Sequence, residues 1–561
     1  MTRRAVILAA IALLGTSLAA GPQAAYDILI TGGRVLDGAG NPWVAANIAI
    51  RGDRIARIGR FTAPATRVID ATGLYVAPGF IDMMDQSGSA LRRDGTAQSK
   101  VRQGVTTLIA GEGGTPVAPA DLEQYFATLE TQGISVNFGT FVSAAQARTA
   151  VLQSANRDPS PEELERMQAI VEAGMQHGAL GLTTALIYPP ESYAKTPELV
   201  ALAKVSARYG GIYASHVRDE GLGELDAIGE AIEIGEKAGL PVEIFHLKVA
   251  HRAGWRTLLP RIDALVQSAR ARGVDVTADQ YPYTASGTGL DSCIPAWAAE
   301  GGAAERNTRL QDPITRARIR DEMKHGSPGW FNRVQAVGTW KNVVIASMPP
   351  SADQHYVGMT IEDIARERRQ PPEDTVMDLV SQSTAGIGAL YFMMSEDDVR
   401  TAMTYPWVSV GSDAAAGSIE TAQGRGHPRQ FGTFPRIIAR YVREARVLTL
   451  ENAVRRMTSL PAGKLHLSGR GTLVEGGFAD ITLFDYERIE DTATYESPHR
   501  YPKGIPYVLV NGQVVVDKGE HTGARPGRVI YGAGRKVASR ESRVVGGRKQ
   551  TVCGRPGPIA P

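Results

Sequence analysis

The sequence predicts an α/β protein: a TIM-like (β/α)8 barrel in the middle, and a small β-sandwich formed by the N- and C-terminal segments. Short apolar strand candidates alternate with helix candidates between residues 78 and 459, which favours parallel strands joined by helices. Alternating strands with glycine turns occur at both ends, in residues 26–77 and 460–530. Two histidines also follow two consecutive strands of the middle region. These observations place the chemistry at one end of a central barrel.

Residues 1–25 have the pattern of an export signal peptide. Thr2–Arg4 is basic, Ala5–Leu14 is apolar, and Gly15–Ala20 offers small residues for cleavage. The apolar run is too short for a membrane span, so we expect no span after removal of the signal. The sequence therefore predicts a bacterial protein that is periplasmic or secreted. Either the general secretion route or, given the arginine pair, the twin-arginine route could export it.

Residues 26–77 carry the first part of the predicted β-sandwich. Their strand candidates are separated by glycine turns at Thr31–Arg34 and Arg51–Arg54. The same pattern of short strand candidates and glycine turns occurs near the other end, in Gly477–Asp485 and Tyr507–Val516. We expect both ends to form one β-sandwich; two unrelated β extensions are the alternative.

The barrel prediction rests on strand candidates in residues 78–459. With intervening helices they make about eight units, as a (β/α)8 barrel requires. The strand candidates are Thr107–Ala110, Asn137–Val142, Leu180–Ala185, Gly211–Ala214, Val242–Phe245, Val274–Ala278 and Val408–Val410. Residues 295–349 fit the alternation poorly because they mix charged helix-like stretches with Gly/Pro breaks. We expect an inserted lid there, over the barrel mouth.

The composition favours a small-molecule partner over nucleic acid. Charged residues make up 21%, the net charge is +2, and aromatic residues make up 6%. No basic stripe interleaved with stacking aromatics occurs in the folded region. Cys293 and Cys553 are the two cysteines, one mid-chain and one in the tail, so no structural disulfide is expected. Residues 531–561 are rich in Gly, Arg and Lys, which predicts a disordered basic tail.

Two histidines at neighbouring strand ends mark the candidate site. The apolar runs Gly211–Ala214 and Val242–Phe245 are followed by His216 and His246, with a helical pattern at Leu225–Ala238 between them. Neighbouring strand ends of a parallel barrel can aim two side chains at one point, and imidazole is the commonest zinc ligand. A lone histidine is more often structural, but this pair predicts a metal or catalytic site.

Several segments resemble the N-acyl-D-amino-acid deacylases (D-aminoacylases) of the amidohydrolase superfamily. Pro78–Asp82 resembles the first barrel strand of the superfamily. The other matching segments are Lys100–Thr107, Gly178–Thr184, Ile187–Pro190, Tyr213–His216, Asp279–Tyr283, Gly411–Asp413, His427–Arg429, Phe431–Arg436, Val510–Gly512 and Gly519–Gly527. Each string is loose alone, but their order and spacing are specific. The resemblance covers nearly all of Tyr26 to Ile530 and implies an amidohydrolase-type barrel with zinc.

The resemblance implies a metal-assisted hydrolysis. His216 and His246 fall on the zinc-binding histidines of the family, and Asp413 falls on its catalytic aspartate. Zinc would polarise the amide carbonyl and lower the pKa of a bound water. Asp413 would take the proton of that water and pass it to the leaving amine.

The resemblance also implies three substrate-binding residues. Arg429 falls in the segment that binds the substrate carboxylate, which a guanidinium can grip bidentately. Tyr283 and Lys248 lie in matching motifs near the site. Lys248 could be carboxylated like the bridging lysine of related two-metal hydrolases, but we favour an ammonium that contacts the substrate or a ligand carboxylate.

Two departures from the family pattern concern metal ligands. Met84 and Gln86 stand where the family has a His-x-His pair, and both are poor zinc ligands, so we expect one zinc ion per chain. Gly113 stands where family members commonly have a cysteine ligand. The adjacent Glu112 is the expected third ligand, unless it is only a helix-start charge. Asp85 is a less favoured substitute because strand alternation points it away from the histidines.

The expected activity is zinc-dependent removal of the acyl group from a small-molecule N-acyl-D-amino acid. Preference for the D configuration comes from the resemblance alone. One alternative is hydrolysis of another amide: a D-dipeptide, a cyclic amide or an imide. The other is a catalytically inactive barrel kept for binding, although the retained His216, His246 and Asp413 argue against it. Arg218, Asp219 and Glu220 are expected to form only an ion-paired loop at the barrel mouth.

Overall fold

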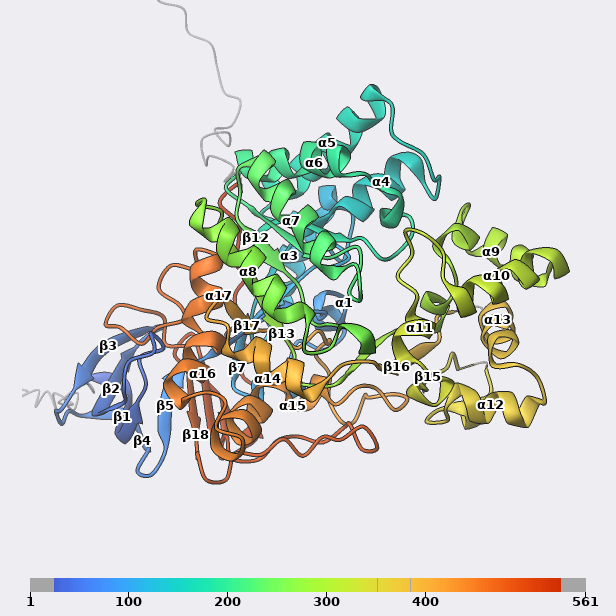
Figure 1. The fold of residues 1–561 in the computed structure, drawn as a ribbon. Coiled ribbons are helices and arrows are strands. Elements are labelled where there is room, and N and C mark those ends of the chain that lie inside the picture. The colour runs from blue at the N-terminus through green and yellow to red at the C-terminus, as the bar shows by residue number, and fades with distance from the viewer. Residues whose placement is uncertain (1–24, 351, 384, 536–561) are drawn as a thin grey trace, which may run out of the picture.

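The computed structural model, which describes residues 25–350, 352–383 and 385–535, confirms the predicted fold class (Figure 1). A central α/β barrel lies between a β domain and an inserted subdomain, at opposite sides of the view. The predicted signal peptide, apart from residue 25, and most of the predicted tail lie outside the described residues. Within the described part of the chain, no helix combines the length and apolar character needed to cross a bilayer.

Parallel strands form the barrel in chain order. They pair as β6-β7-β8 and as β9-β10-β11-β12-β13-β17. Phe141 separates β8 from β9, so these two act as one interrupted strand. The Asp413 N–H donates to the Met84 carbonyl at 2.9 Å, which joins the segment after β17 to β6 and closes the ring. The strands are β6 (Phe80–Asp85), β7 (Val105–Ala110), β8 (Asn137–Thr140), β9 (Val142–Ser143), β10 (Gly181–Ala185), β11 (Ile212–His216), β12 (Val242–Ile244), β13 (Val276–Gln280) and β17 (Val408–Val410).

Helices cover the outside of the barrel and bury one apolar face each. In α7 (Glu224–Ala238), Ile228, Ala231 and Ile232 are buried, and Gly239 ends the helix in the left-handed conformation. The other helices of the barrel region are α1 (Gly88–Arg93), α2 (Gln98–Val101), α3 (Leu122–Gln132), α4 (Ala144–Leu152), α5 (Pro161–Gln176), α6 (Thr196–Arg208), α8 (Leu258–Ala271), α14 (Glu396–Thr404), α15 (Arg429–Arg436), α16 (Leu450–Met457) and α17 (Ser459–Lys464). All of these helices except α17 contribute to one large hydrophobic core, and Ala462 of α17 belongs to a smaller apolar cluster.

Both ends of the chain build a single β domain, so the alternative of two unrelated extensions is wrong. Its nine-stranded sheet is joined where β5 pairs antiparallel with β18, and Ile30, Ile48 and Ile481 share its core. The strands are β1 (Tyr26–Val35), β2 (Val44–Arg51), β3 (Arg54–Gly59), β4 (Ala65–Asp70), β5 (Tyr75–Pro78), β18 (Ile481–Phe484), β19 (Tyr507–Val510), β20 (Gln513–Asp517) and β21 (Glu520–His521). Beyond them, the Gly532 N–H donates to the Gly178 carbonyl at 2.9 Å, so the first residues of the predicted tail contact the barrel.

The inserted subdomain occupies residues 285–394, between β13 and β17, and is larger than the predicted 295–349. It has its own hydrophobic core. Its elements are β14 (Ala285–Gly289), α9 (Ala303–Gln311), α10 (Pro313–His325), α11 (Arg333–Val337), β15 (Val343–Ser347), α12 (Ile361–Arg368), α13 (Pro372–Gln382) and β16 (Gly388–Phe392). The predicted bounds were too narrow because α12, α13 and β16 repeat the helix–strand texture of the barrel. The strands of the subdomain pair antiparallel in the order β14-β16-β15, in a sheet separate from the parallel strands of the barrel.

Candidate metal centre

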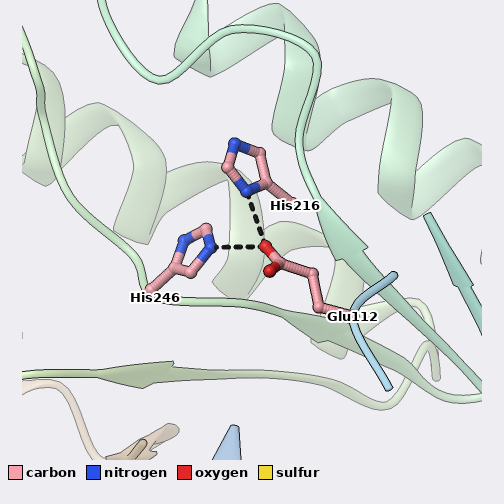
Figure 2. Close-up of side chains that lie close together, drawn as sticks. All are labelled: Glu112, His216 and His246. Atoms are coloured by element: carbon pink, nitrogen blue, oxygen red, sulfur yellow. Dashed lines mark hydrogen bonds and ion pairs between the residues drawn. The ribbon is translucent and has the colours of Figure 1, made fainter. Parts of the chain in front are cut away.

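Three donor atoms converge at the carboxyl ends of the barrel strands (Figure 2). Glu112 follows β7, His216 ends β11, and His246 lies just after β12. Glu112 Oε1 lies 2.7 Å from His216 Nδ1 and 3.1 Å from His246 Nε2. Among the described residues, this is the group of His, Cys, Asp and Glu side chains whose donor atoms all lie within 4.8 Å of one another. One carboxylate and two imidazoles are donors that zinc prefers.

Backbone geometry aims these side chains at one point. His246 has a φ of +39°, a left-handed value that few non-glycine residues adopt, and its N–H donates to Asp279 Oδ1 at 3.0 Å. Glu112 follows Gly111, which has a φ of +108°, and a Cβ at Gly111 would lie 2.7 Å from the Phe141 nitrogen. The Gly-rich turn is therefore required for Glu112 to reach the histidines.

The charge states also suit a cation. Burial raises the pKa of Glu112, but hydrogen bonds to His216 and His246 and their charges outweigh it and hold that pKa well below its usual range. Burial and the neighbouring Lys248 charge lower the pKa of His246. These shifts favour the ionised form of Glu112 and the neutral form of His246, which are the forms that bind metal.

Glu220 is a second buried carboxylate behind the two imidazoles. Its Oε1 lies 3.4 Å from His216 Nε2 and 3.3 Å from His246 Nδ1, and it pairs with the Lys248 ammonium. Burial raises the pKa of Glu220, but the charges of His216, Lys248 and His246 hold it below its usual range. His216 Nε2 has no hydrogen-bond partner among the described residues, and His246 Nδ1 lies 2.7 Å from Lys248 Nζ, so Glu220 acts on the two imidazoles through its charge.

The expected ion pairing of this loop is confirmed for Arg218 and Glu220, but Glu220 also lines the site cavity, which the sequence did not indicate. Arg218 does pair in this way, with Glu230 at 2.9 Å, whereas Asp219 accepts the Gly221 N–H. The signal for Glu220 was a carboxylate four residues after one strand-end histidine, with a lysine two residues after the other. The Glu220 pair also favours the ammonium form of Lys248 over a carboxylated lysine.

Asp413 lies across the barrel mouth, after β17. It has a φ of +47°, and its Oδ2 is 2.7 Å from Arg429 Nη1. That contact is an ion pair without hydrogen-bond alignment, since Nη1 and Nε of Arg429 have no hydrogen-bond partner among the described residues. The Arg429 guanidinium lies over the Tyr281 ring, 4.7 Å from its centroid. It therefore keeps donors available for a carboxylate ligand.

A buried cation supports the Asp413 loop from below. Lys100 Nζ lies 2.8 Å from a carboxylate oxygen of Asp82 and 2.8 Å from one of Asp85, and it donates to Ser412 Oγ at 2.6 Å. Asp82 Oδ1 accepts the Ser412 N–H at 2.8 Å. Asp85 is thus part of the Lys100 network and not a substitute metal ligand.

Gln86 lies between the two sides of the site. Its Nε2 donates to Glu112 Oε2 at 2.6 Å and to Asp413 Oδ1 at 3.3 Å. The two N–H groups of one amide therefore bridge two carboxylates. Met84 is buried in an apolar cluster with Ile81 and Ile109. The sequence marked both positions as departures, but the bridge itself depends on distances that no spacing reveals.

Tyr283 does not line the site cavity, contrary to the expectation that it binds substrate. Its hydroxyl donates to the Pro428 carbonyl at 3.4 Å, and its ring packs on His427 with centroids 5.2 Å apart. The Tyr283 N–H bonds the Tyr281 carbonyl at 3.0 Å, so a turn replaces strand alternation there. Tyr281 faces the cavity instead.

A cavity of about 300 Å³ joins these groups. Its walls include β14, from Ser286 to Thr288, and Tyr188. Six charged side chains line it: Glu112, Glu220, Asp413, Lys248, Arg333 and Arg429. Arg333, from the inserted subdomain, was not singled out by the sequence, where it is one of many lid arginines. The arrangement can hold a metal ion, a proton-transfer carboxylate and an anionic ligand together.

Comparison with known proteins gives concordant matches. The Amidohydrolase family model matches residues 351–516. D-aminoacylase from Alcaligenes xylosoxydans xylosoxydans is 33% identical over 90% of this chain and 97% of its own length. N-acyl-D-glutamate deacylase from the same organism is also 33% identical, over 91% of this chain and 97% of its own.

A solved structure agrees with these relatives. It is the N-acyl-D-glutamate deacylase from Bordetella bronchiseptica, complexed with zinc and a phosphonate inhibitor that mimics the tetrahedral intermediate. It has a TM-score of 0.76 and 31% identity, and the match covers 90% of this chain and 99% of that one.

Proposed function

The chain belongs to the D-aminoacylase family of the amidohydrolases, and on this premise we propose that it removes the acyl group from N-acyl-D-amino acids with one zinc ion. The observation that carries the proposal is the convergence of Glu112, His216 and His246 on one point, facing Asp413 across a shared cavity. The relatives named D-aminoacylase and N-acyl-D-glutamate deacylase supply the substrate class, and the zinc-bound relative supplies the metal.

The histidine side of the cavity would hold the metal. Glu112 Oε1, His216 Nδ1 and His246 Nε2 are the proposed ligand atoms, and the Glu220 carboxylate adds negative charge beside the outer nitrogens of both rings. When bound, zinc polarises the scissile carbonyl and lowers the pKa of a water molecule. The donor set fits zinc because a buried carboxylate compensates part of the charge of the ion.

Asp413 is placed to transfer protons. It takes a proton from the attacking water and delivers it to the departing amine nitrogen, the role of a general base that then acts as a general acid. Its left-handed backbone and the Lys100 network fix the position of its carboxylate. The Gln86 amide donates to the same Oδ1, which leaves Oδ2 toward Arg429.

Arg429 and Lys248 are the proposed substrate-binding residues. Arg429 is buried, lines the cavity and has unused donors, so its guanidinium fits the α-carboxylate of the substrate. Lys248 also lines the cavity, and its ammonium is held by Glu220. Tyr281 replaces Tyr283 as the aromatic wall beside Arg429.

Export to the periplasm or beyond the cell is part of the proposal. It is supported by the basic residues Arg3 and Arg4, the apolar run Ala5–Leu14 and the small residues that follow. Mass spectrometry of the protein purified from bacterial culture should give a mature N-terminus near residue 25. Retention of Met1 on intact cytoplasmic protein would contradict export.

The deacylase proposal is tested by assaying N-acetyl-D- and N-acetyl-L-amino acids with zinc-loaded protein. We expect acetate release from the D series only. His216→Ala should lose the zinc and at least about 10³-fold in kcat, because metal activation is worth several kcal/mol. His325→Ala, at an exposed histidine, is the matched control. Turnover that persists in zinc-free His216→Ala would refute the metal role.

A further inference from the structure

Arg333 brings a buried guanidinium from the inserted subdomain into the site cavity. It is the first residue of α11, and only 1% of it is exposed. The preceding Asn332 caps this helix by accepting the Val334 N–H at 2.9 Å, and it donates to the Met323 carbonyl at 3.0 Å. The position of Arg333 is therefore fixed by a well-anchored turn.

The partners of Arg333 use only part of its hydrogen-bonding capacity. Its Nη2 donates to the Tyr188 hydroxyl at 3.2 Å, while Nη1 is 3.9 Å from Glu220 Oε2, beyond hydrogen-bond length. Glu220 already pairs with Lys248. Arg333 Nε is buried and has no hydrogen-bond partner among the described residues. A buried charge in this state is costly unless a ligand completes it.

Arg333 and Arg429 approach adjacent residues of the same cavity wall. Arg429 Nη2 contacts the Gly287 carbonyl at 3.4 Å. Arg333 reaches Thr288 through Tyr188, whose hydroxyl is 2.9 Å from Thr288 Oγ1. Ser286 Oγ, on the same strand, is also buried without a partner among the described residues. The wall thus offers two separate guanidinium groups, one more than an α-carboxylate needs.

The balance of charges in the cavity also favours a ligand with two carboxylates. Its three carboxylates, Glu112, Glu220 and Asp413, are matched by three cations, Lys248, Arg333 and Arg429. A divalent ion at the metal centre would then leave two positive charges without a counter-charge. A substrate with a single carboxylate neutralises one of them, whereas a dicarboxylate neutralises both.

We infer that the enzyme acts on N-acyl-D-amino acids with an acidic side chain, and that Arg333 binds the side-chain carboxylate while Arg429 binds the α-carboxylate. This inference rests on the proposed deacylase function and names the substrate class of the same site. The relatives named D-aminoacylase and N-acyl-D-glutamate deacylase are each 33% identical to this chain, so overall similarity does not choose between their substrates, and the inference rests on Arg333.

The first test compares isosteric acid and amide substrates with the full-length zinc enzyme. N-acetyl-D-glutamate and N-acetyl-D-aspartate are paired with N-acetyl-D-glutamine and N-acetyl-D-asparagine. We expect kcat/KM to favour the acid of each pair by about 100-fold or more, because bidentate charge-assisted hydrogen bonds are lost with the amide. Equal kcat/KM values within a pair would overturn the inference.

The second test uses matched arginine variants. Arg333→Met should reduce the acid-over-amide ratio to within about threefold, with kcat/KM for the amides changed little, and Arg333→Lys should restore part of it. Arg429→Met should lower kcat/KM for all four substrates together. Thermal unfolding of each variant checks the fold.

The outcomes separate this inference from the function beneath it. Uniform loss of all four activities in a folded Arg333→Met would assign Arg333 a structural role and overturn the inference. Hydrolysis of neutral N-acetyl-D-amino acids without acid preference would do the same and leave the deacylase proposal standing. Failure to hydrolyse any N-acetyl-D-amino acid would refute both.

Discussion

The two sides of the barrel mouth solve the problem of buried carboxylates differently. On the histidine side, Glu112 faces His216 and His246, and the three donor atoms leave room for a metal ion. On the aspartate side, Gln86 and Arg429 contact Asp413 directly. Asp413 thus has one amide donor on Oδ1 and an ion pair with Arg429 at Oδ2. The comparison teaches that an amide bridge can take the place of a cation between two carboxylates.

The charged groups that support the two sides differ in sign. Behind the histidines, Glu220 contributes negative charge, which suits imidazoles that bind a cation. Below Asp413, Lys100 contributes positive charge to Asp82 and Asp85. The histidine side is therefore built to bind a metal, and the aspartate side is built to hold a carboxylate in place.

Asp413→Asn should have the largest effect of the changes that test this comparison. We expect kcat to fall by about 10² to 10⁴-fold, because proton transfer is lost, while zinc content stays the same. Steady-state kinetics and metal analysis of the same sample check both parts. Asp226→Asn, at an exposed position on α7, is the control. Loss of zinc in Asp413→Asn would show that the two sides are not separate.

Glu220→Gln should weaken the metal site without removing a ligand. Loss of the charge behind both imidazoles should lower zinc affinity by about 10- to 100-fold. Competition with a chelator measures the change, and Glu233→Gln on the exposed face of α7 is the control. An unchanged zinc affinity would show that Glu220 pairs with Lys248 and does not contribute to metal binding.

Gln86→Leu should affect folding stability and leave zinc binding in place, because it removes a bridge but no metal ligand. Glu112 Oε2 would lose its 2.6 Å donor, which should cost about 1–3 kcal/mol of folding stability. Chemical denaturation against Gln124→Leu, an exposed position on α3, isolates this contribution. A Gln86→Leu protein as stable as the wild type would show that the bridge does not contribute to folding stability.

The sequence predicted the features that depend on local pattern. The helix expected at Leu225–Ala238 is α7, Glu224–Ala238, and the histidines at both of its neighbouring strand ends do meet. Periodicity and strand order determine these features, since parallel strand ends share one edge. The departures at Met84 and Gln86 were also visible in the sequence.

Features that depend on distance could not be predicted from the pattern. Glu220 and Arg333 lie in a loop and in an insertion, where no period says which side chain turns inward. Tyr283 was expected at the site from the family resemblance alone, whereas after the turn that follows Gln280 it is Tyr281 that lines the cavity. The bounds of the insertion were missed because its helices and strands alternate in the sequence as those of the barrel do.

The most direct measurement of the central claim is the number of zinc ions bound per chain at saturating zinc, with their positions located by anomalous X-ray scattering. One ion at Glu112, His216 and His246, with Gln86 still between Glu112 and Asp413, is the predicted result. A second ion bound by Asp413 would contradict the claim that an amide replaces the metal on that side.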